Sequence, residues 1–335
     1  MRNLKLLIVG AGSIGKRHTR NLIKIGIKPT NLIVMDTRKD RLNEVHNLGV
    51  NNTHNNFEKA LKEDFDAAII CSPTSMHIDQ SIKIAKLKKH LLIEKPLCSN
   101  LKNIDTLVKL VKKNRLITMI AYIFRFMPSL QFTKKILDQG SIGKTYYLRG
   151  EFSEYLPDWH PYEDYRSFYM AKKTQGGGSI LDQCHIMDLA HHLIGDFKSV
   201  SALNLKLSDL SINADDISEL IIKHKSGVIS SIHTDIFGRN HKKNIEIKGS
   251  KGNISWDFYK NEVIVYNAKK KLSTKYNKFE KDFNKSYIEE LKHFLRSIKN
   301  KSKTSIPLNV GIETMKLIIA AEQSQKLKKE KTIKY

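Results

Sequence analysis

A glycine-rich loop near the start of the chain has the spacing of a nucleotide-binding site. Gly10-Ala11-Gly12-Ser13-Ile14-Gly15 follows an apolar run and opens a helical pattern. In such a loop, Gly10 permits the tight turn, Gly12 lets a pyrophosphate approach, and Gly15 lets helix and strand pack closely. Ser13 and Ile14 begin the helix, whose N-terminus favours phosphate charge. The sequence therefore predicts a dinucleotide site, and the alternative is a tight turn that binds nothing.

Asp36 ends the next apolar run, near the ~20-residue offset at which an acidic residue meets the adenosine ribose. Its negative charge would oppose a 2′-phosphate, so we predict NAD as the cofactor. Arg38 lies just beyond Asp36 and is able to neutralise that phosphate, which leaves NADP as the second choice.

Lys95 is the first candidate for chemistry outside the loop. It follows the apolar run 91–94 and precedes Pro96, whereas many other lysines fall on amphipathic helical patterns. Open α/β sheets bind ligands at the carboxyl ends of their strands, where Lys95 is expected. We predict a functional cation, against the alternative of a surface lysine.

A group of polar residues follows the triple glycine at 176–178. Asp182, His185, Asp188 and His192 have offsets that place them on one helix face. Three interpretations are open for this group. His185 is a general base oriented by Asp182, the group binds a metal, or its members are satisfied polar groups at a domain interface. We predict the first, and no metal.

The elements that must position these residues form two patterns. Apolar runs at 5–9, 32–35, 67–71, 91–94 and 117–121 alternate with amphipathic stretches, which predicts a doubly wound parallel sheet. A helix through Lys113 is expected to have Ser99 as its N-cap. Beyond residue 199, strands follow one another directly, which predicts a large, mainly antiparallel sheet. The fold class is α/β, with a Rossmann domain at 1–122 and an α+β domain for substrate binding and oligomerisation at 123–335.

Composition narrows the class of protein. The 335 residues carry 58 Lys and Arg against 34 Asp and Glu, a formal charge of +24. Because this charge is spread along the chain without a recognition module, we predict no nucleic-acid partner. Three cysteines without metal-like spacing favour a reducing compartment, and no apolar stretch reaches the length of a membrane span. The sequence predicts a cytoplasmic protein with no membrane partner.

Several further segments, taken with the glycine loop, resemble the family of glucose-fructose oxidoreductase, inositol dehydrogenase and the rhizopine-catabolism dehydrogenases (Gfo/Idh/MocA). The resemblance covers nearly the whole chain. Its marks are Cys71-Ser72-Pro73-Thr74 with His77, Glu94-Lys95-Pro96, Phe124-Arg125-Phe126 with Pro128, the turn at 140–143, the triple glycine with Asp182 and His185, and Tyr287 and Glu290 with Phe294. It implies a Rossmann domain, an antiparallel second domain, a cis Lys95-Pro96 bond, and homo-oligomers (dimers or tetramers) formed through the large sheet.

The resemblance also implies roles for individual residues. Lys95, His185 and Asp182 would be catalytic, with His185 taking the hydroxyl proton and Lys95 holding the oxygen. The further cofactor contacts that it implies are Ser72, Pro73, His77, Glu94 and Lys95. The expected substrate contacts are Arg125, Trp159, Tyr165 and Arg166. Trp159, His160, Tyr162, Tyr165 and Arg166 suit a sugar, or else form a loop packed by its own aromatic side chains.

The implied reaction is hydride transfer between a nicotinamide cofactor and a secondary alcohol or ketone of a sugar, amino sugar or nucleotide sugar. The two-residue gap between Asp182 and His185 is shorter than the family's common spacing. With the segments 156–161 and 164–166, it resembles a subgroup of bacterial surface-sugar dehydrogenases. The alternatives are a non-catalytic dinucleotide-binding regulator and a reductase of a non-sugar substrate.

Overall fold

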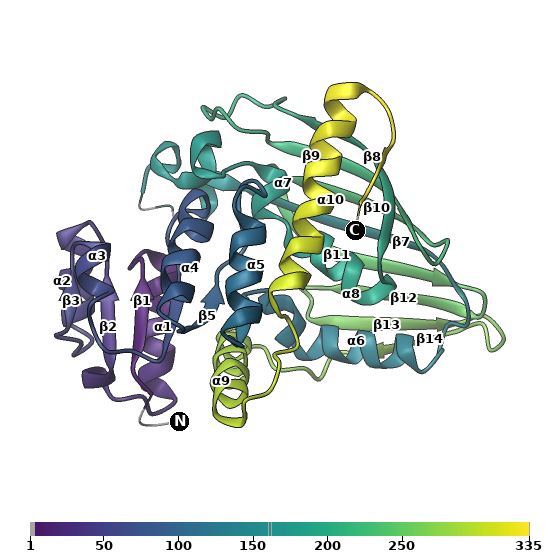
Figure 1. Cartoon of the computed structure of the whole chain (residues 1–335). Helices are drawn as coiled ribbons and strands as arrows, with labels where there is room; N and C mark the ends of the chain where they lie inside the picture. The colour runs from purple at the N-terminus through teal and green to yellow at the C-terminus, as the bar shows by residue number, and fades with distance from the viewer. Residues whose placement is uncertain (1–3, 160, 162, 335) are drawn as a thin grey trace. The chain divides into compact units, whose positions relative to one another are not determined.

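The computed structural model describes residues 4–159, 161 and 163–334. The chain forms two compact units, each built from two stretches of sequence. The first contains Met1–Ile123 and Asn284–Ile312, and the second contains Phe124–Phe283 and Glu313–Tyr335 (Figure 1). The sequence analysis assigned all of 123–335 to one domain, whereas 284–312 packs with the first unit. One contact that holds this segment in the first unit is a hydrogen bond to β6, in which the backbone N–H of Ile120 donates to the carbonyl oxygen of Ile306.

The first unit is a doubly wound parallel sheet, as predicted. Its strand order is β3-β2-β1-β4-β5-β6, and every pairing is parallel. The strands are β1 (Leu6–Val9), β2 (Leu32–Met35), β3 (Thr53–His54), β4 (Ala67–Ile70), β5 (His90–Ile93) and β6 (Thr118–Ile120). All five predicted apolar runs are strands; β3 was missed because two polar residues carry no periodic signal.

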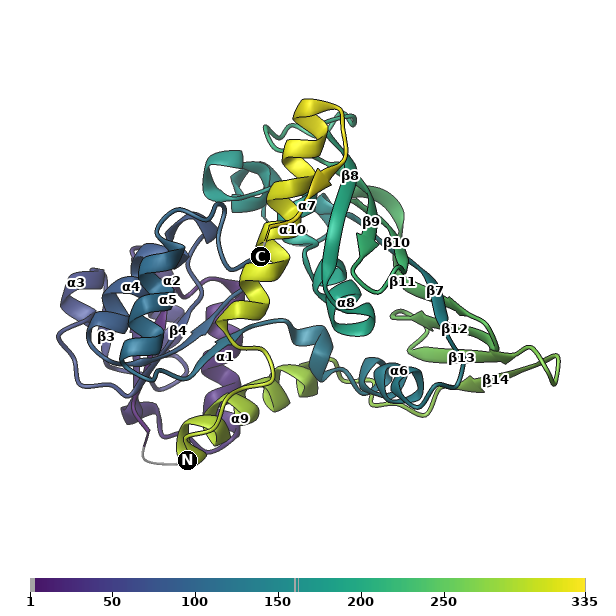
Figure 2. The same ribbon diagram turned by 45° about the vertical axis from the view of Figure 1, so that its right-hand side comes forward.

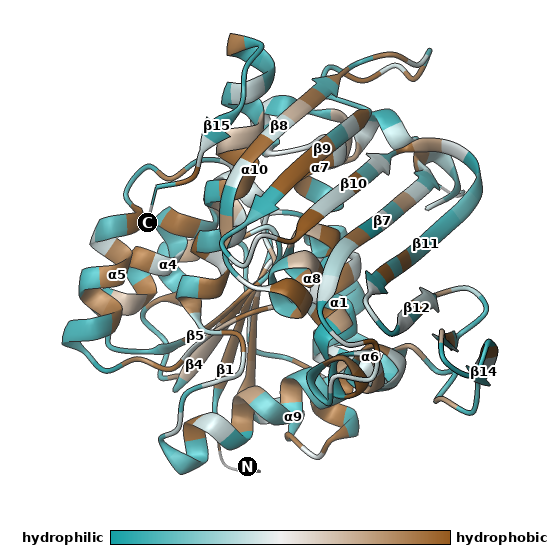
Figure 3. Cartoon of the chain, turned by 90° about the vertical axis from the view of Figure 1, so that its right-hand side faces the viewer, coloured by the Kyte–Doolittle hydropathy of each residue, from teal (hydrophilic) through white to brown (hydrophobic). Residues whose placement is uncertain are grey.

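Helices cover both faces of this sheet. The helices are α1 (Ser13–Lys24), α2 (Lys39–His46), α3 (Phe57–Ala60), α4 (His77–Lys86), α5 (Ile104–Lys113) and α9 (Asn284–Asn300). Figure 3 shows α1 and α9 on one side of β1, β4 and β5, and α4 and α5 on the other. The predicted cap at Ser99 is wrong: α5 begins at Ile104 after Asn103, whose φ is +64°. Asn tolerates this left-handed conformation, so the chain turns into the helix there.

The second unit contains a large, mainly antiparallel sheet, also as predicted. Its order is β14-β13-β12-β11-β7-β10-β9-β8-β15, and β7 and β10 form the one parallel pair among its described strands. The strands are β7 (Thr145–Tyr155), β8 (Phe197–Leu205), β9 (Ile217–His224), β10 (Ile229–Asp235), β11 (Phe237–Gly249), β12 (Gly252–Asp257), β13 (Glu262–Asn267), β14 (Leu272–Tyr276) and β15 (Lys331–Thr332).

Helices pack on one face of this sheet. They are α6 (Pro128–Asp138), α7 (Ser179–Asp182), α8 (His185–Ile194) and the part of α10 (Leu308–Leu327) that belongs to this unit. Gly150 of β7 lets α8 approach, since a Cβ there would lie 2.6 Å from Cδ1 of Ile186. On α6, Ser129 Oγ accepts a hydrogen bond from Trp256 Nε1 at 2.9 Å. Figure 2 shows α8 and α10 beside the sheet, and Figure 3 looks onto its opposite, open face.

Short 3-10 turns make up several connections. They are Pro29–Asn31, Thr74–Met76, Ile123–Phe126, Leu156–Asp158, Tyr165–Ser167, Tyr169–Ala171 and Lys173–Gln175. Four of them fall in the segment between β7 and α7. None of the helices in the described part of the chain is both long enough and apolar enough to cross a membrane.

Candidate functional site

The glycine-rich loop joins β1 to α1, and two of its glycines leave no room for a side chain. Gly10 has a φ of +98°, and a Cβ there would lie 2.7 Å from the carbonyl oxygen of Cys71. A Cβ on Gly15 would lie 1.9 Å from the carbonyl oxygen of Gly10. The start of α1 therefore packs directly on the turn, which fixes the N-terminus of the helix at the carboxyl end of β1.

Gly12 differs from its two neighbours in the motif. A Cβ there would meet Arg41 Nη1 at 3.7 Å, which is ordinary van der Waals contact. The protein itself does not fill this position, as expected of a glycine that a pyrophosphate approaches. The sequence analysis named Arg38 and missed Arg41. Arg41 lies in the first turn of α2, three residues after Arg38, and this spacing could have indicated it.

Asp36 is buried and holds the loop by its carboxylate. Oδ2 accepts a hydrogen bond from the backbone N–H of Ala11 at 2.7 Å, and Oδ1 accepts one from that of Arg38 at 2.9 Å. Arg41 Nη1 lies 3.4 Å from Oδ2. A carboxylate offers about four lone-pair sites, so Asp36 keeps capacity for a ribose hydroxyl. The guanidinium of Arg38 is exposed and pairs with Asp40.

Ser72, Pro73 and His77 follow β4 at the same edge of the sheet. Ser72 Oγ donates to Gln80 Oε1 at 2.6 Å, and Pro73 is exposed. The buried ring of His77 lies between two carbonyl oxygens, that of Ser72 at 2.8 Å from Nε2 and that of Pro96 at 3.0 Å from Nδ1. Both ring nitrogens of His77 therefore face carbonyl oxygens of the chain, and the cofactor contact of this side chain stays a prediction.

Lys95 follows β5, and its peptide bond to Pro96 is cis, as the family resemblance implied. Its backbone N–H donates to Glu94 Oε2 at 3.2 Å. The other oxygen, Glu94 Oε1, lies 2.8 Å from Nε2 of His18, a buried residue of α1. The glycine loop, Asp36, Ser72 and Lys95 thus all lie where parallel strands of one sheet end, the edge at which such sheets bind ligands.

In the second unit, His185 is the first residue of α8. It is 8% exposed, and its ring meets that of Phe124 edge-on at a centroid distance of 4.9 Å. The expectation that Asp182 shares a helix face with His185 is wrong. α7 ends at Asp182 and α8 starts at His185, with Gln183 and Cys184 breaking the helix. Asp182 Oδ1 instead accepts a hydrogen bond from the hydroxyl of Tyr169 at 2.8 Å.

Arg125 and Asp188 form a buried, bidentate ion pair. Arg125 Nε lies 2.8 Å from Asp188 Oδ2, and Nη2 lies 2.6 Å from Oδ1. Their side chains are 9% and 1% exposed. Arg125 therefore lies in the interior of the unit, paired with Asp188, and its role as a substrate contact stays a prediction. His192 nearby has its pKa lowered to about 3, by burial and by the charges of Arg125 and Lys134, so it is neutral at physiological pH.

The remaining predicted substrate residues follow β7. Trp159 and Tyr165 pack against a small apolar cluster of Leu156, Met170 and Ile236. The Tyr165 hydroxyl accepts a hydrogen bond from the backbone N–H of Ser211 at 3.1 Å. Arg166 is exposed and paired with Asp164. The segment thus packs on its own aromatic side chains, and its contact with a sugar stays a prediction. His160 and Tyr162 lie outside the described residues.

A polar network that the sequence did not reveal joins Lys243 and Glu154 to Gln183, which lies two residues before His185 in the chain. Lys243 Nζ is 2.8 Å from Glu154 Oε1 and between 5.4 and 5.8 Å from the ring centroids of Phe124, Phe152 and Phe258. Glu154 also accepts hydrogen bonds from Tyr259 and from Gln183, each at 3.1 Å. Burial and the charge of Glu154 raise the pKa of Tyr259. The sequence could not indicate this network, because Lys243 and Glu154 are far apart in the chain and meet only when β11 pairs with β7.

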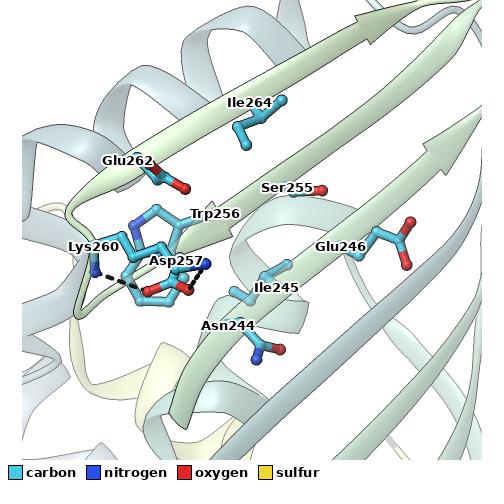
Figure 4. Close-up of a pocket in the computed structure, with 9 residues that line it drawn as sticks. All are labelled: Asn244, Ile245, Glu246, Ser255, Trp256, Asp257, Lys260, Glu262 and Ile264. Carbon is cyan, nitrogen blue, oxygen red and sulfur yellow. Dashed lines mark hydrogen bonds and ion pairs between the residues drawn. The ribbon is translucent and has the colours of Figure 1, made fainter. Parts of the chain in front are cut away.

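A hollow of about 250 Å³ lies on the open face of the sheet across β11 to β13 (Figure 4). Its polar side chains, such as Asn244, Glu246 and Ser255, alternate along the strands with the residues that face α6 and α8. It contains none of the predicted site residues. Among the described residues, no group of three or more His, Cys, Asp or Glu side chains is arranged to hold a metal ion.

Comparison with protein families gives two matches in chain order. Residues 4–122 match the oxidoreductase family model with an NAD-binding Rossmann fold, and residues 130–255 match the GFO/IDH/MocA C-terminal domain. The myo-inositol 2-dehydrogenase of Thermotoga maritima is 29% identical over 99% of this chain and 98% of its own. The NAD(+)-dependent scyllo-inositol 2-dehydrogenase of Bacillus subtilis is 26% identical over 92% of this chain and 89% of its own.

A solved structure shows the same fold across both units. Levoglucosan dehydrogenase in complex with NADH and levoglucosan superposes with a TM-score of 0.88, at 20% identity, over 99% of each chain. At this identity the likeness concerns the fold, and the arrangement of strands described above is therefore shared along the entire length.

The glycine loop yields a prediction that separates cofactor binding from folding. Gly12→Val should abolish NAD binding, measured by calorimetry, while the unfolding temperature stays near that of the wild type, because the protein leaves room for a side chain there. Gly15→Ala should lower the free energy of unfolding by roughly 3 kcal/mol, the upper end of the usual cost of overpacking, since its Cβ would collide with the backbone of Gly10. A folded Gly12→Val variant that binds NAD normally would contradict this account of the loop.

Proposed function

Because the chain belongs to the Gfo/Idh/MocA oxidoreductase family, we propose that it transfers a hydride between NAD and a secondary alcohol or ketone of a sugar or polyol. The observation that carries this proposal is the placement of Lys95 directly after β5, at the sheet edge that also holds the glycine loop and Asp36. A purely regulatory dinucleotide-binding protein would need no such lysine.

The residues at this edge fit the cofactor. Gly12 leaves the space that a pyrophosphate needs, and Asp36 retains acceptors for a ribose hydroxyl. Arg41 places a positive charge beside both of them. When bound, NAD supplies the hydride acceptor or donor. We propose a preference for NAD over NADP, because the Asp36 carboxylate opposes a 2′-phosphate.

The chain's own residues supply the proton chemistry in this proposal. The Lys95 ammonium donates a hydrogen bond to the reacting oxygen and stabilises its negative charge as it develops. His185 takes the hydroxyl proton, or returns it in the reverse reaction. Asp182 and Tyr169, which are hydrogen bonded to each other, hold the turn that precedes α8.

The network around Lys243 favours an uncharged substrate. Lys243 is neutralised by Glu154, and Arg125 and Arg166 are each paired with an aspartate. None of these three cations is left to balance a phosphate or carboxylate of a substrate. Lys243 and Glu154 instead offer a donor and acceptors beside an aromatic surface, which suits the hydroxyls and the C–H face of a sugar ring. We therefore favour a neutral polyol over the nucleotide-linked sugars of the surface-sugar subgroup.

We further propose that copies of the chain associate through the open face of the large sheet. Leu203, Ile221 and Ile229 lie on this face and are 56%, 49% and 40% exposed. A light-scattering mass of two or four chains is expected, and the mass of a single chain would contradict the association.

A cytoplasmic location without a nucleic-acid partner remains our proposal, consistent with three free thiols.

The proposed reaction is tested by a spectrophotometric screen of NAD reduction with neutral polyols, uronates and nucleotide sugars. On the best substrate, Lys95→Ala and His185→Ala should each lower kcat by roughly two to four orders of magnitude, the usual range for a positioned proton-transfer group. NAD affinity should change little, and Lys102→Ala, at an exposed lysine of the same unit, should behave as wild type. A His185→Ala enzyme with normal turnover would remove that residue from the reaction.

The substrate network is tested by a matched pair of double variants. Lys243→Met/Glu154→Gln keeps the volume but removes both charges, and should raise KM for the best polyol about tenfold or more, the effect of losing one good hydrogen bond. Lys242→Met/Glu151→Gln removes the neighbouring pair on the opposite face, where Nζ and Oε1 are 3.4 Å apart. This control should keep the wild-type KM. Equal KM values in both double variants would exclude the network from recognition.

A further inference from the structure

A buried polar cluster in the first unit has no assigned role. Glu290 of α9 is 0% exposed, and neither of its carboxyl oxygens has a hydrogen-bond partner among the described residues. Nδ1 of His18 is likewise buried and without a partner there. The ring of Tyr287, one turn before Glu290, lies 6.1 Å from that of His18. Such groups are rare in proteins and call for an explanation.

The two carboxyl groups of this cluster, Glu94 and Glu290, are in unequal surroundings. Glu94 receives the backbone N–H of Lys95 at 3.2 Å, and its other oxygen lies 2.8 Å from Nε2 of His18. Glu290 receives no donor from the described residues. A fully buried carboxyl group that receives no donor is much less costly in its neutral form, whereas donated hydrogen bonds favour the ionised form. The arrangement thus leaves the negative charge on Glu94 and a proton on Glu290.

We propose that Glu94 and Glu290 hold a single proton, carried by Glu290, and that this keeps one negative charge, on Glu94, beside the reactive Lys95. Glu290 is then a positioning residue that acts through Glu94. The part of the proposal that concerns Lys95 rests on the proposed function, whereas the location of the proton does not.

The titratable groups near Glu290 are also affected by burial and by the two carboxyl groups. Burial, and then the charge of Glu94, raise the pKa of Glu290 well above its usual 4.5. The same two carboxyl groups, after burial, raise the pKa of the Cys71 thiol. The pKa of Tyr287 is raised to about 12 by burial and by both carboxyl groups, against the lowering effect of Arg17 and Lys95. Arg17 lies over the Tyr287 ring at 4.7 Å. At neutral pH, Cys71 and Tyr287 are therefore uncharged.

The proton's location can be tested on the intact protein without a substrate. Infrared spectra at pH 7 should show the carbonyl stretch of a protonated carboxyl group in the wild type. Glu290→Gln should lose this band, while Glu94→Gln and the adjacent exposed control Glu289→Gln should keep it. Loss of the band in Glu94→Gln alone, or a wild type without the band, would overturn the assignment.

Stability against pH gives a second measurement of the same proton. Since folding raises the pKa of Glu290, the folded state binds the extra proton, and wild-type stability should fall as pH rises from about 4.5 towards the folded pKa. Glu290→Gln has no proton to lose, so its melting temperature relative to the wild type should rise by about 2 °C per pH unit over that window. A difference that does not change with pH would contradict a neutral Glu290.

The link to Lys95 is tested by the pH dependence of kcat/KM on the best substrate of the screen. Glu94→Gln removes the neighbouring negative charge, so the alkaline limb, where Lys95 loses its proton, should move to lower pH by about one unit or more. Glu289→Gln should leave the limb in place. An unmoved limb in an active Glu94→Gln enzyme would refute the coupling to Lys95 while leaving the infrared result standing. A wild type inactive on every polyol would refute the proposed function and, with it, the coupling, but not the proton's location.

Discussion

The contact of Gly15 with the carbonyl of Gly10 is the constraint on which the nucleotide-binding unit depends. A Cβ on Gly15 would lie only 1.9 Å from the carbonyl oxygen of Gly10, so this position accepts no other residue unless the backbone moves. The contact fixes the first turn of α1 against the end of β1, and Asp36 then reaches the backbone N–H of Ala11 from the end of β2. His18, one turn further along α1, is brought to Glu94 at the end of β5. One steric requirement thus sets the relative positions of three strand ends.

Local signals predicted much of the fold, and long-range pairing accounts for most of what was missed. The glycine loop, Asp36 and the five apolar runs were readable because each is a short segment with its own periodicity or turn chemistry. Arg41, Lys243 and Glu154 were not, since their importance comes from partners on other elements. The return of Asn284–Ile312 to the first unit likewise depends on a distant contact, Ile306 with Ile120.

The break between α7 and α8 shows a different limit of sequence reasoning. Asp182 and His185 have helical spacing, and nothing in Gln183 or Cys184 forbids a helix. The start of α7 is fixed, because Gly178 lies close to Asp215, whose carboxylate accepts the backbone N–H of Ile180 at 2.9 Å. The helix ends after one turn, and His185 is the first residue of a new helix. A regular spacing therefore established which residues are polar, but not that one helix carries them.

The strong positive charge of the chain is a property of its surface, and its interior follows another rule. The buried cation Arg125 is matched by Asp188, and the largely buried Lys243 by Glu154. Removing one partner of such a pair would leave an uncompensated charge, at a cost of about 3–5 kcal/mol. The first unit instead buries two carboxyl groups, Glu94 and Glu290. In our proposal a proton on Glu290, and not a cationic side chain, neutralises the second of them. The net charge of +24 therefore does not describe the interior, where Arg125 and Lys243 are each paired with a carboxylate.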